Sequence, residues 1–249
     1  MVAPASLVFP PKELDSRMKA LILVAGHGAR LVPAIGETPK ALLEIGGRSL
    51  LDRQIDLMTE LGVERICLAT GYHHEAFASR YGDRVDYRYN PFYRESNNII
   101  SFLFARDWVM DSDLVVCYGD LLYQPEVLEA ALWSPAESAL VIDRGRVEEG
   151  HALISLKGGN VAEIGRSIPV TSADARFVGI AKFAQRGISP LMQAIEAAVR
   201  AGKLGDYYLA GVERLIQEGH AVSPIDVTGC PWTEIDYPED LDAARRDWA

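Results

Sequence analysis

The chain has 249 residues, of which 49% are hydrophobic and 24% are charged, and these proportions are typical of a folded globular protein. They exclude a disordered or low-complexity chain. A net charge of −10 also excludes a diffuse positive surface that would hold nucleic acid or an anionic membrane, so neither is expected as a partner.

The N-terminal segment and the cysteines indicate where the protein works. Residues 1–18 contain no basic stretch followed by an apolar core, and we interpret them as an arm ahead of the domain. No apolar run approaches the roughly 18 residues of a membrane span. The three cysteines form no CxxC motif, which is typical of reduced thiols. We therefore expect a cytoplasmic location.

From Lys19 onward the chain alternates between strand-like and helix-like patterns. The continuously apolar residues 19–26 predict a strand that is buried on both faces. The next element is a helix over residues 49–62, with Ser49 as its N-cap and Asp52 three positions later. Further strands are predicted at 63–71, 84–90 and 113–120, and further helices at 73–82 and 97–109. This order predicts a doubly wound, mostly parallel, Rossmann-like α/β sheet with ligands at the carboxyl ends of its strands.

After about Pro125 the pattern changes to short strands, which are followed by two helices. Strand-like runs occupy residues 139–145, 151–159, 160–166 and 176–183, and helices are predicted at 189–202 and 207–219. A strand at 220–227 and a helix beginning at Pro238 complete the chain. We therefore predict one domain over 19–249, in which residues 126–249 form a small α+β lobe packed on residues 19–125.

The strongest local signal is the glycine-containing loop that follows the first predicted strand. Gly26 and Gly28 allow main-chain N–H groups to approach a phosphate closely, and Arg30 and Lys40 add cationic donors. This combination predicts a site for anions. A GxG pair is weak evidence when it stands alone, because many such turns only connect two elements.

Two familiar nucleotide-binding motifs do not match this loop. A dinucleotide fingerprint requires a third glycine three residues after Gly28, but Leu31 stands there, and Pro33 and Pro39 interrupt any helix. A Walker A loop requires GxxxxGK followed by Ser or Thr, and no such string occurs. The loop therefore belongs to neither class.

Carboxylates at two distant positions are candidate ligands for a divalent cation. Asp120 ends the apolar strand predicted at 113–120. In an extended segment Glu234 and Asp236 share a face while Ile235 points away from it, and paired carboxylates suit Mg²⁺. Asp236 also has a simpler interpretation, as a favourable charge near the N-terminus of the following helix. The histidines show no metal-ligand spacing, so none is predicted as a ligand.

Three separated segments resemble a known enzyme superfamily. Residues 25–72, with the proline-containing loop and the Pro39-Lys40 pair, resemble the sugar-phosphate and phosphocholine nucleotidyltransferases. Residues 90–106 and 232–244 are similar to the bacterial phosphocholine and phosphonate cytidylyltransferase branch. The resemblance covers nearly the whole chain from Lys19.

This resemblance implies a Mg²⁺-dependent cytidylyltransferase. CMP would pass from CTP to a small phosphate or phosphonate acceptor, such as phosphocholine or 2-aminoethylphosphonate, with release of pyrophosphate. The implied metal ligands are Asp120, Glu234 and Asp236, and the implied catalytic residues are Arg30, Lys40, Asp120 and Asp236. The implied nucleotide-binding residues are Ala25, Gly26, His27, Gly28, Ala29, Arg30, Lys40, Thr70, Gly71, Asn98, Ser101 and Gly119. Residues 19–125 would then bind the nucleotide and residues 126–249 the acceptor.

Three other functions are weighed against this one. A sugar-1-phosphate nucleotidyltransferase that uses UTP, dTTP or GTP is the main alternative. A glycosyltransferase is disfavoured because Asp120 is followed by Leu121 and Leu122, which gives no DxD motif. A nucleotide-binding module without catalysis would not need the retained charged residues.

The sequence provides weaker evidence for the acceptor-binding residues than for the nucleotide-binding residues. Lys182, in an alternating strand, is predicted to face the acceptor, and the rings of Tyr207 and Trp232 could enclose a cationic head group such as choline. Three arginines stand where a choline site would need acidic walls: Arg144, Arg146 and Arg166. A more anionic or amino-acid-like acceptor therefore stays open, as does a homodimer.

Overall fold

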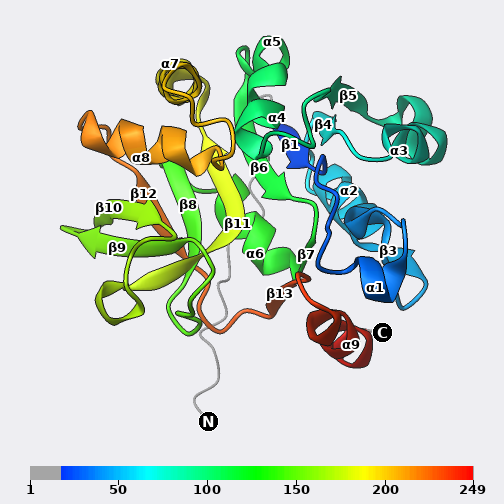
Figure 1. Cartoon of the computed structure of the whole chain (residues 1–249). Helices are drawn as coiled ribbons and strands as arrows, with labels where there is room; N and C mark the ends of the chain where they lie inside the picture. The colour runs from blue at the N-terminus through cyan, green and yellow to red at the C-terminus, as the bar shows by residue number, and fades with distance from the viewer. Residues whose placement is uncertain (1–17, 249) are drawn as a thin grey trace.

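The computed structural model describes residues 18–248 (Figure 1). The predicted arm, residues 1–18, lies outside them except for Met18, which begins strand β1 (Met18–Leu23). Four parallel strands form one side of the sheet, in the order β6 (Asp113–Tyr118), β1, β4 (Arg65–Thr70) and, at the edge, β5 (Asp86–Tyr89). All six side chains of β1 are buried, as expected of a strand that is covered on both faces.

Beyond β6 the sheet becomes antiparallel. Strand β11 (Ala175–Phe183) pairs antiparallel with β6, with β9 (Leu153–Lys157) and with β8 (Ser138–Asp143). Strand β10 (Asn160–Gly165) forms a hairpin with β9, and β12 (Ser223–Asp226) lies parallel to β8. The predicted mixed α/β sheet with a smaller α+β lobe is thus confirmed, and Figure 1 shows the β9–β10 hairpin on the side opposite α2 and α3.

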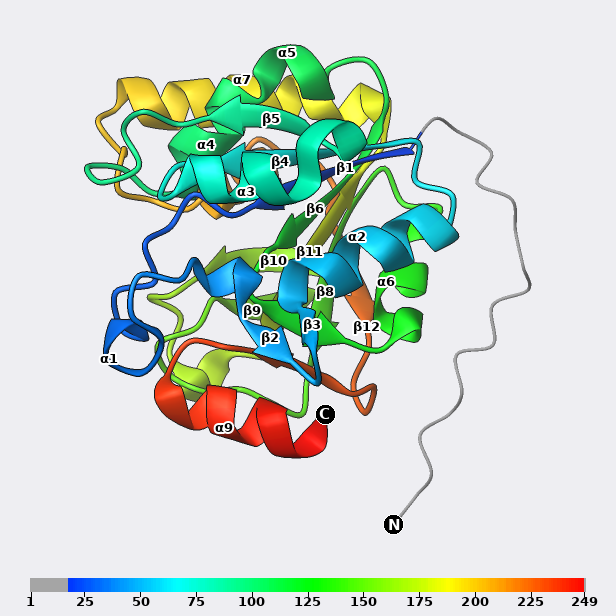
Figure 2. The same cartoon turned by 90° about the vertical axis from the view of Figure 1, so that its right-hand side faces the viewer.

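Helices cover both faces of this sheet. Helices α4 (Asn98–Phe104), α5 (Arg106–Val109), α7 (Gln185–Arg200) and α8 (Leu209–Gln217) pack on the face that includes Leu21 and Leu23. Helices α2 (Leu50–Glu60), α3 (His74–Tyr81) and α6 (Pro125–Leu132) pack on the face that includes Ala20 and Ile22. Figure 2 shows α5 and α7 above strands β1, β4 and β5, and α2 and α6 below them. No helix within residues 18–248 is long and apolar enough to cross a membrane.

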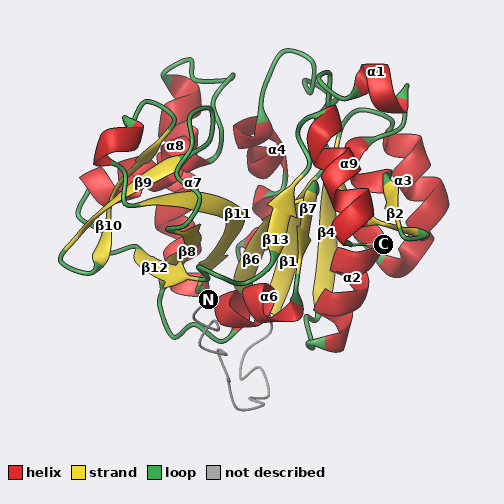
Figure 3. Cartoon of the chain, turned by 90° about the horizontal axis from the view of Figure 1, so that it is seen from below, coloured by secondary structure: helices red, strands yellow, loops and turns green. Residues whose placement is uncertain are grey.

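A third, smaller core lies under the C-terminal helix. Helix α9 (Pro238–Asp247) buries Leu241 against Leu31 and Ile235, beside α1 (Val32–Ile35) and β2 (Glu44–Ile45) (Figure 3). Strand β13 (Trp232–Glu234) leads into α9 and pairs with β7 (Leu121–Tyr123). The remaining elements are short: β3 (Arg48–Ser49) and the 3-10 turns η1 (Lys40–Leu42), η2 (Gly82–Arg84) and η3 (Val170–Ser172).

Most of the predicted elements are present, with some differences. The helix predicted over 97–109 is divided at Ala105 into α4 and α5. The strands β2, β3, β7 and β13 and the helices α1 and α6 were not predicted as such. Pro33, expected to interrupt any helix, stands in the first turn of α1, where its missing N–H has no intrahelical partner to lose. Strands of two or three residues carry too short a pattern to be recognised in sequence, because their stability comes from the pairing partner.

The predicted cap of α2 allows a test of stability. The Ser49 hydroxyl accepts a hydrogen bond from the Asp52 N–H at 3.0 Å, and the Asp52 carboxylate accepts from the Ser49 N–H at 3.2 Å. Arg80 and Tyr81 of α3 donate to the same carboxylate, at 2.5 and 2.9 Å. Burial opposes ionisation, but these donors outweigh it and lower the pKa of Asp52 well below its usual range. Asp52 therefore connects two helices through its charge.

We expect Asp52→Asn to lower the free energy of unfolding by about 1–2 kcal/mol at pH 7. Because the pKa of Asp52 is lower in the folded state, the stabilising effect is complete above its unfolded pKa of about 3.9 and is lost progressively as the pH falls from there through the folded pKa, so the deficit should be smaller at pH 3 than at pH 7. Urea unfolding at pH 7 and pH 3 measures this difference. Asp242→Asn, on the exposed side of α9, is the matched control and should change little. An equal deficit of Asp52→Asn at both pH values would contradict the assignment.

Candidate active site

A cavity of about 320 Å³ opens at the carboxyl ends of β1 and β6. Its walls come from the loop after β1, from Asp120 after β6, and from residues of the second half such as Arg176, Glu234 and Asp236. The carboxyl edge of the parallel strands is where ligands bind in open α/β sheets. The sequence thus places its candidate loop and its candidate carboxylates at one cavity.

Two glycines let the backbone approach closely at this edge. Gly28 has φ +64°, a conformation that favours glycine, and a Cβ there would lie 3.4 Å from the Cβ of Lys40. A Cβ on Gly119 would lie 2.3 Å from a methyl group of Val24. Only glycine therefore allows the turn before Asp120 to pass beside the end of β1.

The pairing of β7 with β13 brings the distant carboxylates together. Leu121 pairs with Glu234, and the Ile235 N–H donates to the Asp120 carbonyl at 3.0 Å. From α2, the side-chain amide of Gln54 donates to the carbonyls of Tyr118 and Leu121, at 3.1 and 3.0 Å. These bonds fix the turn that carries Asp120. Ile235 is fully buried while Glu234 and Asp236 line the cavity, which is the alternation that the sequence predicts.

One ammonium group links two of these carboxylates. The Lys40 Nζ lies 2.7 Å from Asp120 Oδ2 and 2.5 Å from Asp236 Oδ1. Arg30 lies 3.6 Å from Asp236 and 4.9 Å over the ring of Tyr237. Burial alone would lower the pKa of Lys40, but the two carboxylates outweigh it and raise that pKa above its ordinary value. Lys40 is therefore charged throughout the neutral range.

Asp120 is the carboxylate least satisfied by the protein. Burial raises its pKa, and the nearby charge of Glu234 adds to this effect, while Lys40 partly offsets it. Its Oδ1 atom is buried and has no hydrogen-bond partner within residues 18–248. A buried carboxylate oxygen without a partner costs free energy, and a cation would remove that cost.

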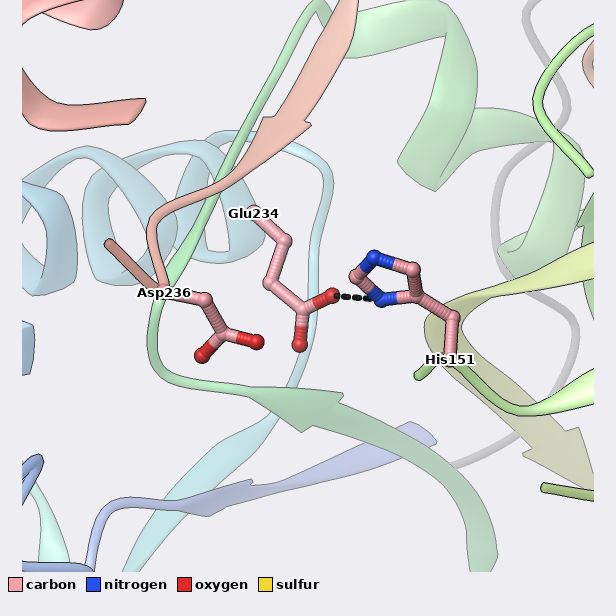
Figure 4. A group of neighbouring side chains, drawn as sticks. All are labelled: His151, Glu234 and Asp236. Carbon is pink, nitrogen blue, oxygen red and sulfur yellow. Dashed lines mark ion pairs between the residues drawn. The ribbon is translucent and has the colours of Figure 1, made fainter. Parts of the chain in front are cut away.

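Figure 4 shows a second group, in which His151, Glu234 and Asp236 point toward one another. Their ligand atoms lie within 4.8 Å of each other, and His151 Nδ1 is 3.6 Å from Glu234 Oε2. Arg176 of β11 donates to the same Glu234 oxygen at 2.5 Å. Burial favours the neutral form of Glu234, but His151 and Arg176 reverse this and lower its pKa. Glu234 is thus held as an anion that faces the cavity.

The donor set fits a divalent cation. Three carboxylates meet at one cavity, one of their oxygens is buried without a partner, and Mg²⁺ prefers oxygen ligands. The arrangement differs from the expected ligand set in one respect. His151 joins Glu234 and Asp236, whereas Asp120 is bound to Lys40. The carboxylates Asp120, Glu234 and Asp236 remain our candidates for the metal.

Most of the predicted site residues line the cavity. They are Ala25, Gly26, Gly28, Ala29, Arg30, Lys40, Asn98, Ser101, Gly119, Asp120, Tyr207, Glu234 and Asp236. The other three nucleotide-site candidates are not part of the cavity wall. His27 packs edge-on against Tyr72, the Thr70 hydroxyl lies 2.9 Å from His74 Nδ1, and Gly71 adjoins Tyr93.

Two predicted acceptor-binding residues lie elsewhere, and this placement corrects the expectation. The Lys182 ammonium donates to the Ala136 carbonyl at 2.7 Å, and Lys182 is not part of the cavity wall. Because β11 runs antiparallel to β6, Lys182 pairs with Val115, near the start of β6 and away from its carboxyl end. Trp232 is buried, and its ring N–H donates to Asp143 at 2.8 Å. The guanidinium groups of Arg146 and Arg176 lie over its ring, so that ring is not open to a ligand.

Sequence reasoning missed three residues of the second half that line the cavity: His151, Arg166 and Arg176. His151 and Arg166 flank the β9–β10 hairpin, and no spacing between them indicates a shared site. In the sequence Arg166 has the same standing as Arg144 and Arg146. The structure shows that Arg166 lines the cavity and that the other two do not. Arg144 pairs with Asp226, and Arg146 donates to the Trp232 carbonyl.

This chain is similar to one family model and to several known nucleotidyltransferases. The model of the MobA-like NTP transferase domain family matches residues 20–178. The CTP:phosphoglutamine cytidylyltransferase of Campylobacter jejuni is 23% identical over 90% of this chain and 98% of its own length. The UTP--glucose-1-phosphate uridylyltransferase AglF of Haloferax volcanii is 24% identical over 92% of this chain and 96% of its own length. The structure of the CTP:phosphocholine cytidylyltransferase of Streptococcus pneumoniae superposes with a TM-score of 0.77 at 22% identity, and covers 94% of this chain and 100% of that one.

Proposed function

The chain belongs to the MobA-like NTP transferase domain family, and from this premise we propose that it is a Mg²⁺-dependent cytidylyltransferase. It transfers CMP from CTP to a small phosphate or phosphonate acceptor and releases pyrophosphate. Relatives over nearly the full length include a cytidylyltransferase, which supports the choice of CTP.

One observation carries the proposal: Asp120, Asp236 and Lys40 meet beside the glycine loop. Nucleotidyl transfer brings negative charge to the reacting phosphorus, so a catalyst must supply positive charge at that point. Lys40 and Arg30 supply two cations on the side of the loop. The carboxylates supply ligands for Mg²⁺, which would neutralise charge on the α-phosphate when bound.

The residues of the chain divide the remaining tasks. Main-chain N–H groups of the loop around Gly26 and Gly28 hold the triphosphate, because no side chain there obstructs the approach. Arg30 and Lys40 stabilise the departing pyrophosphate. For the triphosphate to take Lys40, its ammonium must move away from Asp120 and Asp236, which frees both carboxylates. The glycine-loop half, residues 19–125, is then the nucleotide half, and residues 126–249 bind the acceptor.

No general base is needed for the acceptor. A phosphate monoester has a second pKa near 6, so its oxygen is largely ionised at neutral pH and attacks directly. The acceptor oxygen forms a bond to the α-phosphorus of CTP while the bond to the β-phosphate oxygen breaks, and pyrophosphate carries away the charge. Positioning and charge neutralisation therefore account for the chemistry.

The test is release of pyrophosphate from CTP in the presence of Mg²⁺ and a panel of phosphate and phosphonate acceptors. We expect turnover with CTP, its loss on addition of EDTA, and its recovery with excess Mg²⁺. Turnover of sugar-1-phosphates with UTP, dTTP or GTP in preference to CTP would instead show the alternative that the Haloferax relative represents. Silence with every nucleotide and acceptor would refute the proposal.

A further inference from the structure

The acceptor side of the cavity carries one cation that no carboxylate balances. Arg166 follows β10, is exposed, and lines the cavity. Its guanidinium lies 4.7 Å over the ring of Tyr207. Tyr207 directly precedes helix α8, and α8 packs on β10. No carboxylate within residues 18–248 forms an ion pair with it.

The other cations of the cavity are already paired. Lys40 contacts Asp120 and Asp236, and Arg30 lies beside Asp236. Arg176 is 6% exposed and pairs with Glu234. These pairs involve Asp120, Glu234 and Asp236, the carboxylates that line the cavity within residues 18–248. Among the described residues, Arg166 is the cation of the lining that is left without a carboxylate partner.

The cavity offers a cationic acceptor no free carboxylate within residues 18–248. A quaternary or primary ammonium is bound by aromatic faces and by carboxylates. The ring of Tyr207 is the aromatic surface expected for that role, but the Arg166 guanidinium already lies over it. The three carboxylates of the cavity are each paired with Lys40, Arg30 or Arg176. An ammonium group on the acceptor would therefore meet Arg166 without a compensating charge.

We propose that the acceptor carries a carboxylate at the end remote from its phosphorus, and that Arg166, supported by the ring of Tyr207, binds this group. The inference rests on the proposed function and specifies its substrate class. A guanidinium matches a carboxylate with two parallel hydrogen bonds, and stacking on an aromatic ring holds it in a fixed plane. Arg166 is thus a specificity-determining residue.

Three phosphonates that differ only in the distal group provide the test: 3-phosphonopropionate, propylphosphonate and 2-aminoethylphosphonate. With CTP and Mg²⁺ we expect kcat/KM for 3-phosphonopropionate to exceed that for propylphosphonate by about tenfold or more, with 2-aminoethylphosphonate the poorest. A preference for 2-aminoethylphosphonate over the neutral compound would overturn the proposal.

Variants identify the group responsible. Arg166→Gln should reduce the ratio between the carboxylate and the neutral acceptor to about one, Arg166→Lys should retain part of it, and Arg166→Glu should favour the ammonium compound. Arg144→Gln, which removes an arginine paired outside the cavity, is the matched control and should keep the full ratio. Thermal melts establish that each variant is folded.

Two outcomes would reject Arg166 as the carboxylate-binding group. In the first, Arg166→Gln keeps the full ratio of kcat/KM between 3-phosphonopropionate and propylphosphonate. In the second, kcat/KM falls by the same factor for all three acceptors, which would show that Arg166 binds the phosphonate itself. If no combination of acceptor and nucleotide releases pyrophosphate, the proposed function is refuted. Equilibrium binding of 3-phosphonopropionate against propylphosphonate, with the same variants, then decides the inference separately.

Discussion

Asp120→Asn is expected to lower kcat by about 10²–10³-fold while the protein remains folded. The substitution removes a charge from the centre of the carboxylate cluster with almost no change in shape. Lys40 keeps Asp236 as a partner at 2.5 Å, so no buried cation is left alone. Pyrophosphate release under saturating CTP and Mg²⁺ measures the loss.

The direction in which Asp120→Asn changes the free energy of unfolding follows from the pKa of Asp120. Burial raises the pKa of Asp120, so its ionised form costs the folded state free energy at neutral pH. The group favours folding below its unfolded pKa, and this contribution is lost as the pH rises through the folded pKa. We therefore expect the free energy of unfolding of Asp120→Asn at pH 7 to equal or exceed that of the wild type. Asp107→Asn, at an exposed ion pair with Arg88, is the control and should retain full activity.

Lys40→Met is expected to abolish activity and, unlike Asp120→Asn, to destabilise the protein. The substitution leaves Asp120 without its cation and Asp236 with Arg30 alone, at 3.6 Å, and the two carboxylate side chains are 21% and 11% exposed. Removal of one partner from such a cluster costs about 2–4 kcal/mol. Urea unfolding in EDTA measures the deficit, and Lys203→Met, at an exposed pair with Asp206, is the control.

Mg²⁺ distinguishes this charge effect from a simple packing loss. At the proposed metal site of the wild type, the Lys40 ammonium would compete with a metal ion for Asp120 and Asp236. In Lys40→Met this competition is gone, so Mg²⁺ alone should raise the melting temperature of the variant more than that of the wild type. Equal shifts in the two proteins would show that Lys40 does not compete for the carboxylates.

Local sequence patterns were sufficient to predict the features that depend only on residues close together in the chain. The run of buried residues in β1, the cap formed by Ser49 and Asp52, and the alternation around Ile235 all follow from spacing within one element. The order of strands and helices likewise predicted the central parallel sheet, because parallel strands require connecting helices.

Strand direction and long-range pairing could not be predicted in this way. Lys182 has the right alternation for a wall residue, but the antiparallel course of β11 puts Arg176 at the cavity and Lys182 at the far end. His151 and Arg166 reach the cavity because β9 pairs with β11, with Ile154 opposite Ala175. These placements depend on tertiary contacts that leave no periodic signal in the sequence.

The ladder between Leu121–Tyr123 and Trp232–Glu234 has a consequence for biosynthesis. A ribosome makes the glycine loop first and Asp120 later, but Glu234 and Asp236 follow only after strands β8 to β12 have been made. An unfinished polypeptide therefore presents a loop suited to phosphate without the carboxylates that complete the centre. A chain terminated before Trp232 would therefore lack two of the three carboxylates that line the cavity.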